Sequence, residues 1–384
     1  MRCDLKGTMI TNGNLDNYIC GLKRWLPDRL GVKAVEVTEL RRPAVGQSSG
    51  TWLFDATDDE HNVHSLVLRT DPGPQGIFFD ADVTREARVL EGLAQSGGVP
   101  VPRVIGVEGT RDTIGVPFFV MEQISGRVPQ GKPSMHSTGW VASLSAGALA
   151  RLWDSAMATL VAVHSTFWPA AHSFLVSRIS EGSSPPAAFL ERRLRWLTEW
   201  YSWTTKGREY PITDAGMSYL AERSAVVSRR LARPVLLWGD ARVGNMVFDD
   251  DNLVVAALDW ELATVGPPEI DLAHWLFFDE FATTAAGVDR LSGWPDRETT
   301  LTRYSQMTGR EVNDLEYFDV MQLVFMATTL IRQSDRRVEL GLSETGTRMG
   351  HDNTVTQMLA SRLGLQVPDL SPDYLAHRGV SSAK

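Results

Sequence analysis

The segment from Leu236 to Ala273 constrains this chain more than any other, and it reads LLWGDARVGNMVFDDDNLVVAALDWELATVGPPEIDLA. Within it, Asp240, Asn245 and Asp259 interrupt apolar runs in a fixed order. One carboxylate can orient an acceptor hydroxyl and take its proton, while an amide oxygen and a second carboxylate can hold Mg²⁺ beside nucleotide phosphates. The segment therefore predicts a site for phosphoryl transfer.

The residues before Asp240 predict how it is presented. The apolar run at 234–238 predicts a buried strand, and Gly239 permits a tight turn after it. Asp and Asn in loops commonly form turns and nothing more, and the spacing Asp-x4-Asn alone occurs by chance. The whole ordered string is more specific. We therefore favour a catalytic site and keep simple turn formation as the alternative.

The residues after Asn245 predict a hairpin. Runs at 246–248 and 253–258 have strand character, and four polar residues between them form the turn. A hairpin of this length would return Asp259 to the neighbourhood of Asn245. Gly and Pro residues then break the chain before a predicted helix that opens at Asp271.

Size and charge limit the class of protein. A chain of 384 residues is long enough for two lobes around a cleft. The net charge of −9 argues against a nucleic-acid binder. Two cysteines, Cys3 and Cys20, form neither a disulfide framework nor a zinc spacing. Without a signal-peptide pattern or a run of about 18 apolar residues, we expect a cytoplasmic protein with no membrane partner, either a monomer or a homodimer.

The first third of the chain predicts a small sheet with two helices. Strand-like runs alternate with turn residues, and apolar residues recur at helical spacing in two segments. The predicted helices are 15–30 and 84–93, and the predicted strands are 35–40, 51–56, 65–69, 99–105 and 117–124.

Between the first two strands lies the run Gly46-Gln-Ser-Ser-Gly50. The backbone and hydroxyls of Gln47, Ser48 and Ser49 would suit a loop that covers phosphates. The run also matches the Gly-x-Ser-x-Gly elbow of serine hydrolases, with Ser48, Asp259 and His274 as a conceivable triad. An elbow requires a helix after the Ser, whereas the following residues have strand character, so the hydrolase is the weaker alternative.

The remainder of the chain predicts long helices. They are expected at 149–167, 186–205, 210–231, 271–284, 297–307, 315–339 and 352–362, with a fraying tail from 367. His164 is interpreted as a core histidine with satisfied hydrogen bonds. Arg192, Arg193 and Arg195 are expected on a solvated face, with contact to an anionic substrate as the alternative.

The run from Gly126 to Pro133 nearly matches a phosphate-binding P-loop. Pro133 replaces the hydroxyl residue that would bind Mg²⁺, and Pro129 stiffens the loop. We interpret the run as a linker or lid.

The segment Leu236–Ala273 resembles the catalytic segment of the aminoglycoside phosphotransferase and choline kinase type enzymes. Their pattern is His-Gly-Asp, four residues, Asn, a hairpin to Asp, and then Asp-Leu-Ala. The resemblance implies that Asp240 is catalytic, that Asn245 and Asp259 are metal ligands, and that Asp271 is structural. Trp238 stands where the family usually has His, and an indole would replace it by packing and by one N–H donor.

The resemblance extends to the first third of the chain. It implies that a strand cation meets the α and β phosphates and pairs with a helix carboxylate, and Arg69 and Glu86 match these positions. The family more often has Lys there, and Arg would grip phosphate with a planar fork. Kinase-like domains fused to some acyl-CoA dehydrogenases have Arg, and this chain resembles them more. Backbone groups from Glu122 to Ile124 would bond the adenine edge.

The resemblance implies an α+β, bilobal protein-kinase-like fold, with a nucleotide-binding lobe at 1–122 and a mainly helical catalytic lobe at 123–384. The implied reaction moves the γ-phosphoryl of ATP or GTP, with Mg²⁺, to a hydroxyl of a small molecule. A nucleotide-binding pseudo-kinase without turnover is the main alternative, because Trp238 and Arg69 depart from the family pattern.

The large lobe also suggests the kind of acceptor. Tryptophans and arginines recur there alongside acidic residues, and the acidic set is Asp279, Glu280, Asp314, Glu316 and Asp319. Aromatic walls with scattered cations suit an apolar or hydroxyacyl compound better than a polycation. We therefore expect poor activity on aminoglycosides.

Overall fold

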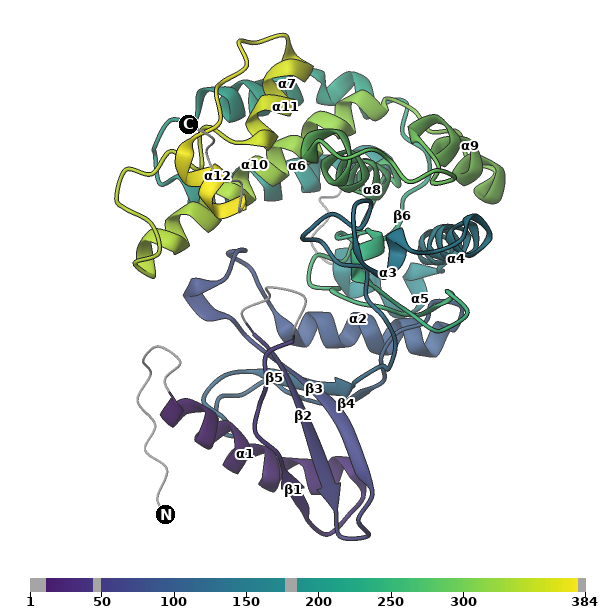
Figure 1. Cartoon of the computed structure of the whole chain (residues 1–384), viewed down its shortest axis with the longest axis vertical. Helices are drawn as coiled ribbons and strands as arrows, with labels where there is room; N and C mark the ends of the chain where they lie inside the picture. The colour runs from purple at the N-terminus through teal and green to yellow at the C-terminus, as the bar shows by residue number, and fades with distance from the viewer. Residues whose placement is uncertain (1–11, 44–49, 177–184, 379–384) are drawn as a thin grey trace.

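A five-stranded antiparallel sheet forms the smaller lobe of this computed structural model, which describes residues 12–43, 50–176 and 185–378 (Figure 1). The spatial order of the strands is β1-β2-β3-β5-β4. Their bounds are β1 (Val35–Val37), β2 (Thr51–Asp58), β3 (Val63–Thr70), β4 (Val104–Glu108) and β5 (Phe118–Glu122). This arrangement places β3, which carries Arg69, at the centre of the sheet.

Two helices cover the two faces of this sheet. Helix α1 (Asn12–Leu30) packs against one face, where Phe118 of β5 lies in its apolar cluster. Helix α2 (Val83–Ser96) packs against the other, where the next residue, Phe119, joins its cluster. Successive side chains of a strand point to opposite faces, so the alternation of the sequence produces both contacts.

The start of α2 is fixed by its first residues. The Asp82 side chain accepts hydrogen bonds from the backbone N–H groups of Thr84 and Arg85, which have no partner within the helix. This cap places Glu86 in the first turn of α2. Because Thr51 pairs with Arg69 in the β2–β3 register, the sheet brings Thr51 and Arg69 together beside that turn.

The larger lobe is mainly helical (Figure 1). Its longer helices are α4 (Ala146–Ser165), α6 (Pro185–Thr205), α7 (Pro211–Val227), α8 (Glu269–Ala282), α9 (Arg297–Thr308), α10 (Leu315–Glu339) and α11 (Thr354–Leu363). Shorter ones are α3 (Gly139–Ala142), α5 (Trp168–Ala171) and α12 (Pro372–Arg378), and single turns of 3-10 helix lie at Ser173–Val176, Val243–Asn245 and Thr284–Ala286. A further 3-10 turn, Gly73–Gln75, follows β3 in the smaller lobe. Two small antiparallel pairs complete it, β6 (Val235–Leu237) with β9 (Thr264–Gly266) and β7 (Met246–Phe248) with β8 (Val254–Ala257).

The fold class is the α+β arrangement that the sequence predicted, with local differences. Strand β4 begins at Val104 rather than Val99, because Pro100 and Pro102 have no N–H to give to a ladder. Within the tail expected to fray, residues Pro372–Arg378 form α12, whose Tyr374 is buried. Strand β9 was not predicted, since three residues ending in a glycine carry little strand signal.

Helix α4 is the one helix among the described residues that is long and apolar enough to cross a membrane by length and composition. Half of its apolar window is buried inside the protein. Leu152, Ala156 and Leu160 of α4 belong to the central apolar cluster, so packing in the core accounts for its hydropathy.

Candidate active site

The turn after β6 presents Asp240 and is built on a glycine. Gly239 has a φ of 89°, and a Cβ there would lie 2.4 Å from the carbonyl oxygen of Leu262. The Asp271 carboxylate accepts the N–H of Trp238 at 2.7 Å and of Gly239 at 3.0 Å. Asp271 is fully buried, which makes this contact between α8 and the turn structural, as the resemblance implied.

Replacing Gly239 with Ala should destabilise the protein by more than about 1 kcal/mol, because the new methyl group meets both a positive φ and a backbone oxygen. Chemical denaturation would measure the loss. Gly147→Ala is a matched control, since Gly147 lies in α4 with nothing within 4 Å of its Cβ position. Equal stability of the two variants would contradict this account of the turn.

Trp238 supports the same turn from within the core. Its indole N–H donates to the carbonyl of Leu258 at 2.8 Å, and its ring stacks on Trp260 with centroids 5.4 Å apart. The packing and the single N–H donor expected of Trp238 are both present. His164 is also a satisfied core histidine, bonded to Asp271 at 3.1 Å and to the Tyr304 hydroxyl at 2.7 Å.

Asp240 is surrounded by donors. Its carboxylate accepts from Asn245 Nδ2 at 2.7 Å and from Arg242 Nε at 3.0 Å, and His274 Nε2 of α8 lies 2.6 Å away. Burial alone would raise the pKa of the Asp240 carboxyl, but Arg242, His274 and Asn245 outweigh it and hold that pKa below its usual range. Asp240 is therefore ionised at neutral pH.

The sequence interpretation did not place Arg242 and His274 in this site. Arg242 follows Asp240 by two residues, which is the signal that would have pointed to it. His274 follows Asp271 by three residues and so lies on the same face of α8. The sequence interpretation had considered His274 only as part of a hydrolase triad.

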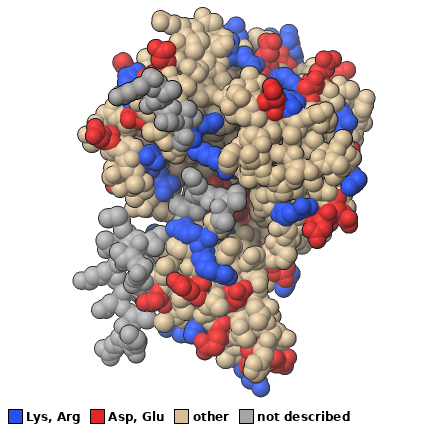
Figure 2. All heavy atoms as spheres, viewed as in Figure 1, with Lys and Arg blue, Asp and Glu red and all other residues tan. Residues whose placement is uncertain are grey.

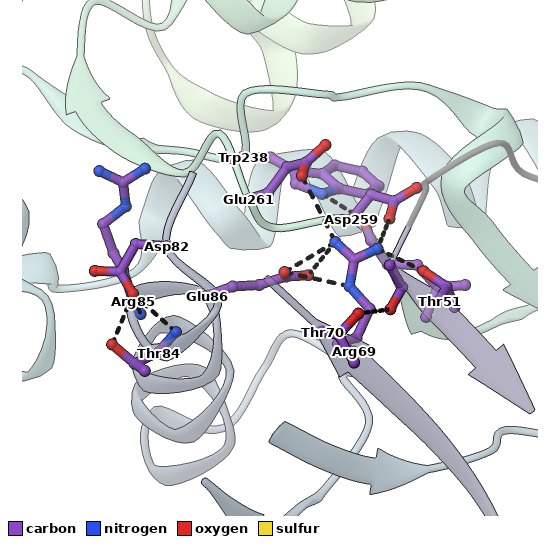
Figure 3. Close-up of polar contacts among 12 residues, drawn as sticks. Thr51, Arg69, Thr70, Asp82, Thr84, Arg85, Glu86, Trp238, Asp259 and Glu261 are labelled. Carbon is purple, nitrogen blue, oxygen red and sulfur yellow. Dashed lines mark hydrogen bonds and ion pairs between the residues drawn. The ribbon is translucent and has the colours of Figure 1, made fainter. Parts of the chain in front are cut away.

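The β7–β8 hairpin brings the predicted metal ligands together. Met246 pairs with Ala257, and the N–H of Leu258 donates to the carbonyl of Asn245 at 2.9 Å. Asp259 follows directly, with a left-handed φ of 58° that turns the chain after the hairpin. Figure 3 shows its side chain directed toward Arg69.

These two side chains offer oxygen donors. The side-chain nitrogen of Asn245 donates to Asp240, which leaves the side-chain oxygen of Asn245 to bind a metal. The side chain of Asp259 is about 36% exposed. Oxygen ligands of this kind suit Mg²⁺, which usually takes only one or two protein carboxylates and completes its shell with water and phosphate. Among the described residues, no group of three or more His, Cys, Asp or Glu side chains could hold a metal ion.

Arg69 and Glu86 form a buried pair. Arg69 Nη2 lies 2.9 and 3.1 Å from the two carboxylate oxygens of Glu86, and Arg69 Nη1 donates to Thr51 Oγ1 at 2.7 Å (Figure 3). The pairing that the resemblance implied for these two residues is thus present. Burial alone would lower the pKa of Arg69, but the surrounding carboxylates raise that pKa by more than burial lowers it. Arg69 therefore remains a cation.

Arg69 also approaches the larger lobe. Its guanidinium lies 3.8 Å from Asp259 and 3.7 Å from Glu261 (Figure 3). Glu261 was missed by the sequence interpretation, although its position two residues after Asp259 is a usable signal. Burial raises the pKa of the Glu261 carboxyl to about 7, with Arg69 opposing the shift and Glu86 adding to it.

The remaining nucleotide-binding predictions have different outcomes. Gln47, Ser48 and Ser49 lie outside the described residues. In the segment 122–124, expected to bond the adenine edge, the N–H groups of Glu122 and Gln123 donate to the carbonyls of Arg103 and Ser65, both at 3.0 Å. These donors already serve the small lobe, and Ile124 follows directly after them.

Two alternatives fail on geometry. Strand β2 rather than a helix follows Gly50, and His274 contacts Asp240 instead of Asp259, so the hydrolase elbow and triad are wrong. The P-loop-like run is bonded to β7 through paired backbone contacts between Arg127 and Phe248, at 2.8 and 2.9 Å, and continues into turns. It is a linker, because a P-loop would join a strand directly to a helix.

Comparison with known proteins agrees with this geometry. The chain is 28% identical over 255 residues to acyl-CoA dehydrogenase family member 10 of Mus musculus, covering 66% of this chain and 21% of that protein. It therefore spans only about a fifth of the length of that relative. The expected likeness to kinase-like domains of acyl-CoA dehydrogenases is confirmed.

Solved structures share the fold. A Ralstonia eutropha protein provisionally described as an aminoglycoside phosphotransferase aligns with a TM-score of 0.63 at 21% identity, covering 90% of this chain and 97% of that one. A choline kinase of Streptococcus pneumoniae aligns with a TM-score of 0.54 at 13% identity, covering 89% and 97%. The fold is therefore protein-kinase-like. Residues 39–301 match the family model described as "Phosphotransferase enzyme family", which is more than half of the 384 residues. This chain belongs to the phosphotransferase enzyme family.

Proposed function

We propose that this protein transfers the γ-phosphoryl group of ATP or GTP to a hydroxyl group of a small molecule, with Mg²⁺. One observation carries the proposal. Asp240, Asn245 and Asp259 converge at one end of the β7–β8 hairpin, and the Arg69–Glu86 pair of the other lobe meets them there. Phosphoryl transfer depends mainly on positioning and charge stabilisation, and this set supplies both.

Asp240 would act on the acceptor. An ionised carboxylate within hydrogen-bond reach of a hydroxyl can orient it and take its proton as the bond to phosphorus forms. Arg242 and His274 hold the carboxylate in place and keep it ionised.

The other residues would serve the nucleotide. The Asn245 oxygen and the Asp259 carboxylate would hold Mg²⁺, which when bound neutralises phosphate charge. Arg69, fixed by Glu86, would meet the α and β phosphates, and backbone groups near Ile124 would bond the adenine edge. Residues 1–122 would then be the nucleotide-binding lobe and 123–384 the catalytic lobe of a cytoplasmic monomer or homodimer.

The second candidate is a pseudo-kinase that binds nucleotide without turnover. The observation in its favour is that Arg69 is already bonded to Glu86 and Thr51, so its fork is occupied within the protein. A screen of hydroxylated metabolites by ATP consumption separates the two candidates. Nucleotide binding without consumption, with any acceptor, would favour the pseudo-kinase.

The larger lobe is poorly suited to a polycationic acceptor. Several of its acidic side chains are already paired, Asp279 with Arg290, Asp314 with Arg230, and Asp319 with Arg297 and Arg362. In Figure 2, Lys and Arg atoms border the recess between the two lobes. An apolar or hydroxyacyl acceptor fits this setting better than an aminoglycoside.

We therefore expect kcat/KM for kanamycin-type aminoglycosides to be about 100-fold lower than for a hydroxyacyl acceptor, because like charges facing each other at a binding surface cost several kcal/mol. The assay uses purified protein with Mg²⁺-ATP and both classes of acceptor. Efficient phosphorylation of an aminoglycoside would contradict the acceptor proposal while supporting the kinase itself.

A further inference from the structure

A cavity of about 560 Å³ lies beside the proposed catalytic site. Its walls come from the start of α2, from α6 and from the segment 261–265. Aromatic side chains form part of the wall, Phe79, Phe174 and Trp196. A volume of this size is typical of sites for small organic ligands.

The cavity adjoins the catalytic residues at two points. Glu261 lines it and lies 3.7 Å from Arg69. On the α6 side, the Arg193 guanidinium lies over Phe325, with 5.5 Å to the ring centroid. The Phe325 ring in turn contacts His274, the partner of Asp240. A ligand in the cavity would therefore lie near the proposed proton acceptor.

Arginines line the same cavity, and two of them are already used by the protein. Arg192 bonds the carbonyls of Leu175 and Val265 and the hydroxyl of Thr264, which fixes α6 to β9. Arg85 pairs with Asp80 at 3.5 Å. The solvated face that the sequence predicted for 192–195 is therefore wrong for Arg192, because α6 packs against the segment that follows Asp259.

Arg193 differs from these two. Its Nε is buried and has no hydrogen-bond partner in the described part of the chain, and its guanidinium lies 4.7 Å from the Trp196 ring centroid. Burial lowers the pKa of Arg193 to about 10, with Asp271 and Asp80 opposing the shift, so it is charged at neutral pH. A buried cationic donor without an acceptor is costly and calls for a partner.

We infer that this cavity is the acceptor site and that Arg193 binds a carboxylate or phosphate group carried by an otherwise apolar acceptor. The planar fork of an arginine suits both anions. Phe79 and Trp196 would cover the apolar body, and the hydroxyl would extend toward Glu261, which lies 3.7 Å from Arg69 of the proposed catalytic site. The assignment of the ligand as the acceptor rests on the proposed function, whereas anion binding by Arg193 does not.

The test measures binding without turnover. Octanoate, octyl phosphate and neutral octanamide are titrated calorimetrically into the full-length wild type and into Arg193→Gln. We expect the variant to bind the preferred anion 10- to 100-fold more weakly and octanamide equally well, because hydrogen bonds to a charged group are worth about 1.5–3 kcal/mol. The two anions show whether carboxylate or phosphate is preferred. Arg193→Lys keeps the charge but not the planar fork. Its affinity for the preferred anion should therefore lie between that of the wild type and that of Arg193→Gln.

Controls separate this inference from misfolding and from the reaction. Arg230→Gln removes an exposed arginine paired with Asp314 and should bind the anions as the wild type does. Binding of Mg²⁺-ATP is measured for Arg193→Gln and for Arg230→Gln to check that each variant is folded. The inference is overturned if the wild type does not prefer an anion to octanamide, or if Arg193→Gln binds all three ligands as the wild type does. A failed acceptor screen would contradict the phosphotransferase proposal but would leave a measured loss of anion binding intact.

Discussion

Asp240→Asn should lower turnover by roughly 10²- to 10⁴-fold and leave the affinity for Mg²⁺-nucleotide nearly unchanged, as expected when a positioned proton acceptor is lost. The carboxylate lies at the turn after β6, where Asn245, Arg242 and His274 surround it with donors. An amide cannot take the acceptor proton, and its NH₂ group would face at least one of these donors. Single-turnover rates and nucleotide titrations measure the two effects separately.

Asp250→Asn is the matched control for this variant. Asp250 lies in the exposed turn of the β7–β8 hairpin, only ten residues further along the chain. It should change neither rate nor binding. The melting temperature of Asp240→Asn must be compared with that of the wild type, because the substitution alters a partly buried hydrogen-bond network. Near-normal turnover in a folded Asp240→Asn protein would remove Asp240 from the mechanism.

Asp259→Ala should weaken Mg²⁺-nucleotide binding and turnover together, by about 100-fold or more in kcat/KM. The Asp259 carboxylate would hold the metal ion, whose positive charge offsets that of the phosphates, and such stabilisation is worth several kcal/mol. The substitution also removes a carboxylate of the larger lobe that approaches Arg69, at 3.8 Å. Binding is measured over a range of Mg²⁺ concentrations, where high Mg²⁺ should restore part of the affinity.

Two comparisons make the second result specific. Asn245→Ala should act in the same direction but more mildly, because a neutral amide is the weaker ligand. Asp251→Ala, in the exposed hairpin turn, should have no effect. If Asp259→Ala binds Mg²⁺-ATP as tightly as the wild type, the metal assignment is wrong whatever happens to the rate.

The sequence predicted the arrangement of Asp240, Asn245 and Asp259 because it is local. One turn and one hairpin determine it, and their glycine and polar turn residues are visible in the chain. The Arg69–Glu86 pair was also within reach, since a central strand and the helix after it carry the two residues. Here the resemblance supplied the pairing that spacing alone would not.

The contacts that were missed are those made by packing. His274 reaches Asp240 only because α8 lies against the turn, and the two are 34 positions apart. Arg193 is half-buried, with its Nε covered, because α6 packs beside Phe325 of α10, although a run of arginines on a helix usually indicates a solvated face. Hydrophobic periodicity identifies the helix but does not tell which other helix will cover it.

The buried carboxylate of Asp271 has a consequence for motion. It bonds the backbone of Trp238 and Gly239 and the ring of His164, so a single side chain connects α8, the turn after β6 and α4. Opening any one of these elements would leave buried polar groups without hydrogen-bond partners. The three elements should therefore open as one cooperative unit, and their amide hydrogens should exchange with a free energy of opening close to that of unfolding the whole lobe. Whatever movement accompanies ligand binding is then left to the elements around this unit, and Asp240 itself is carried on a rigid support.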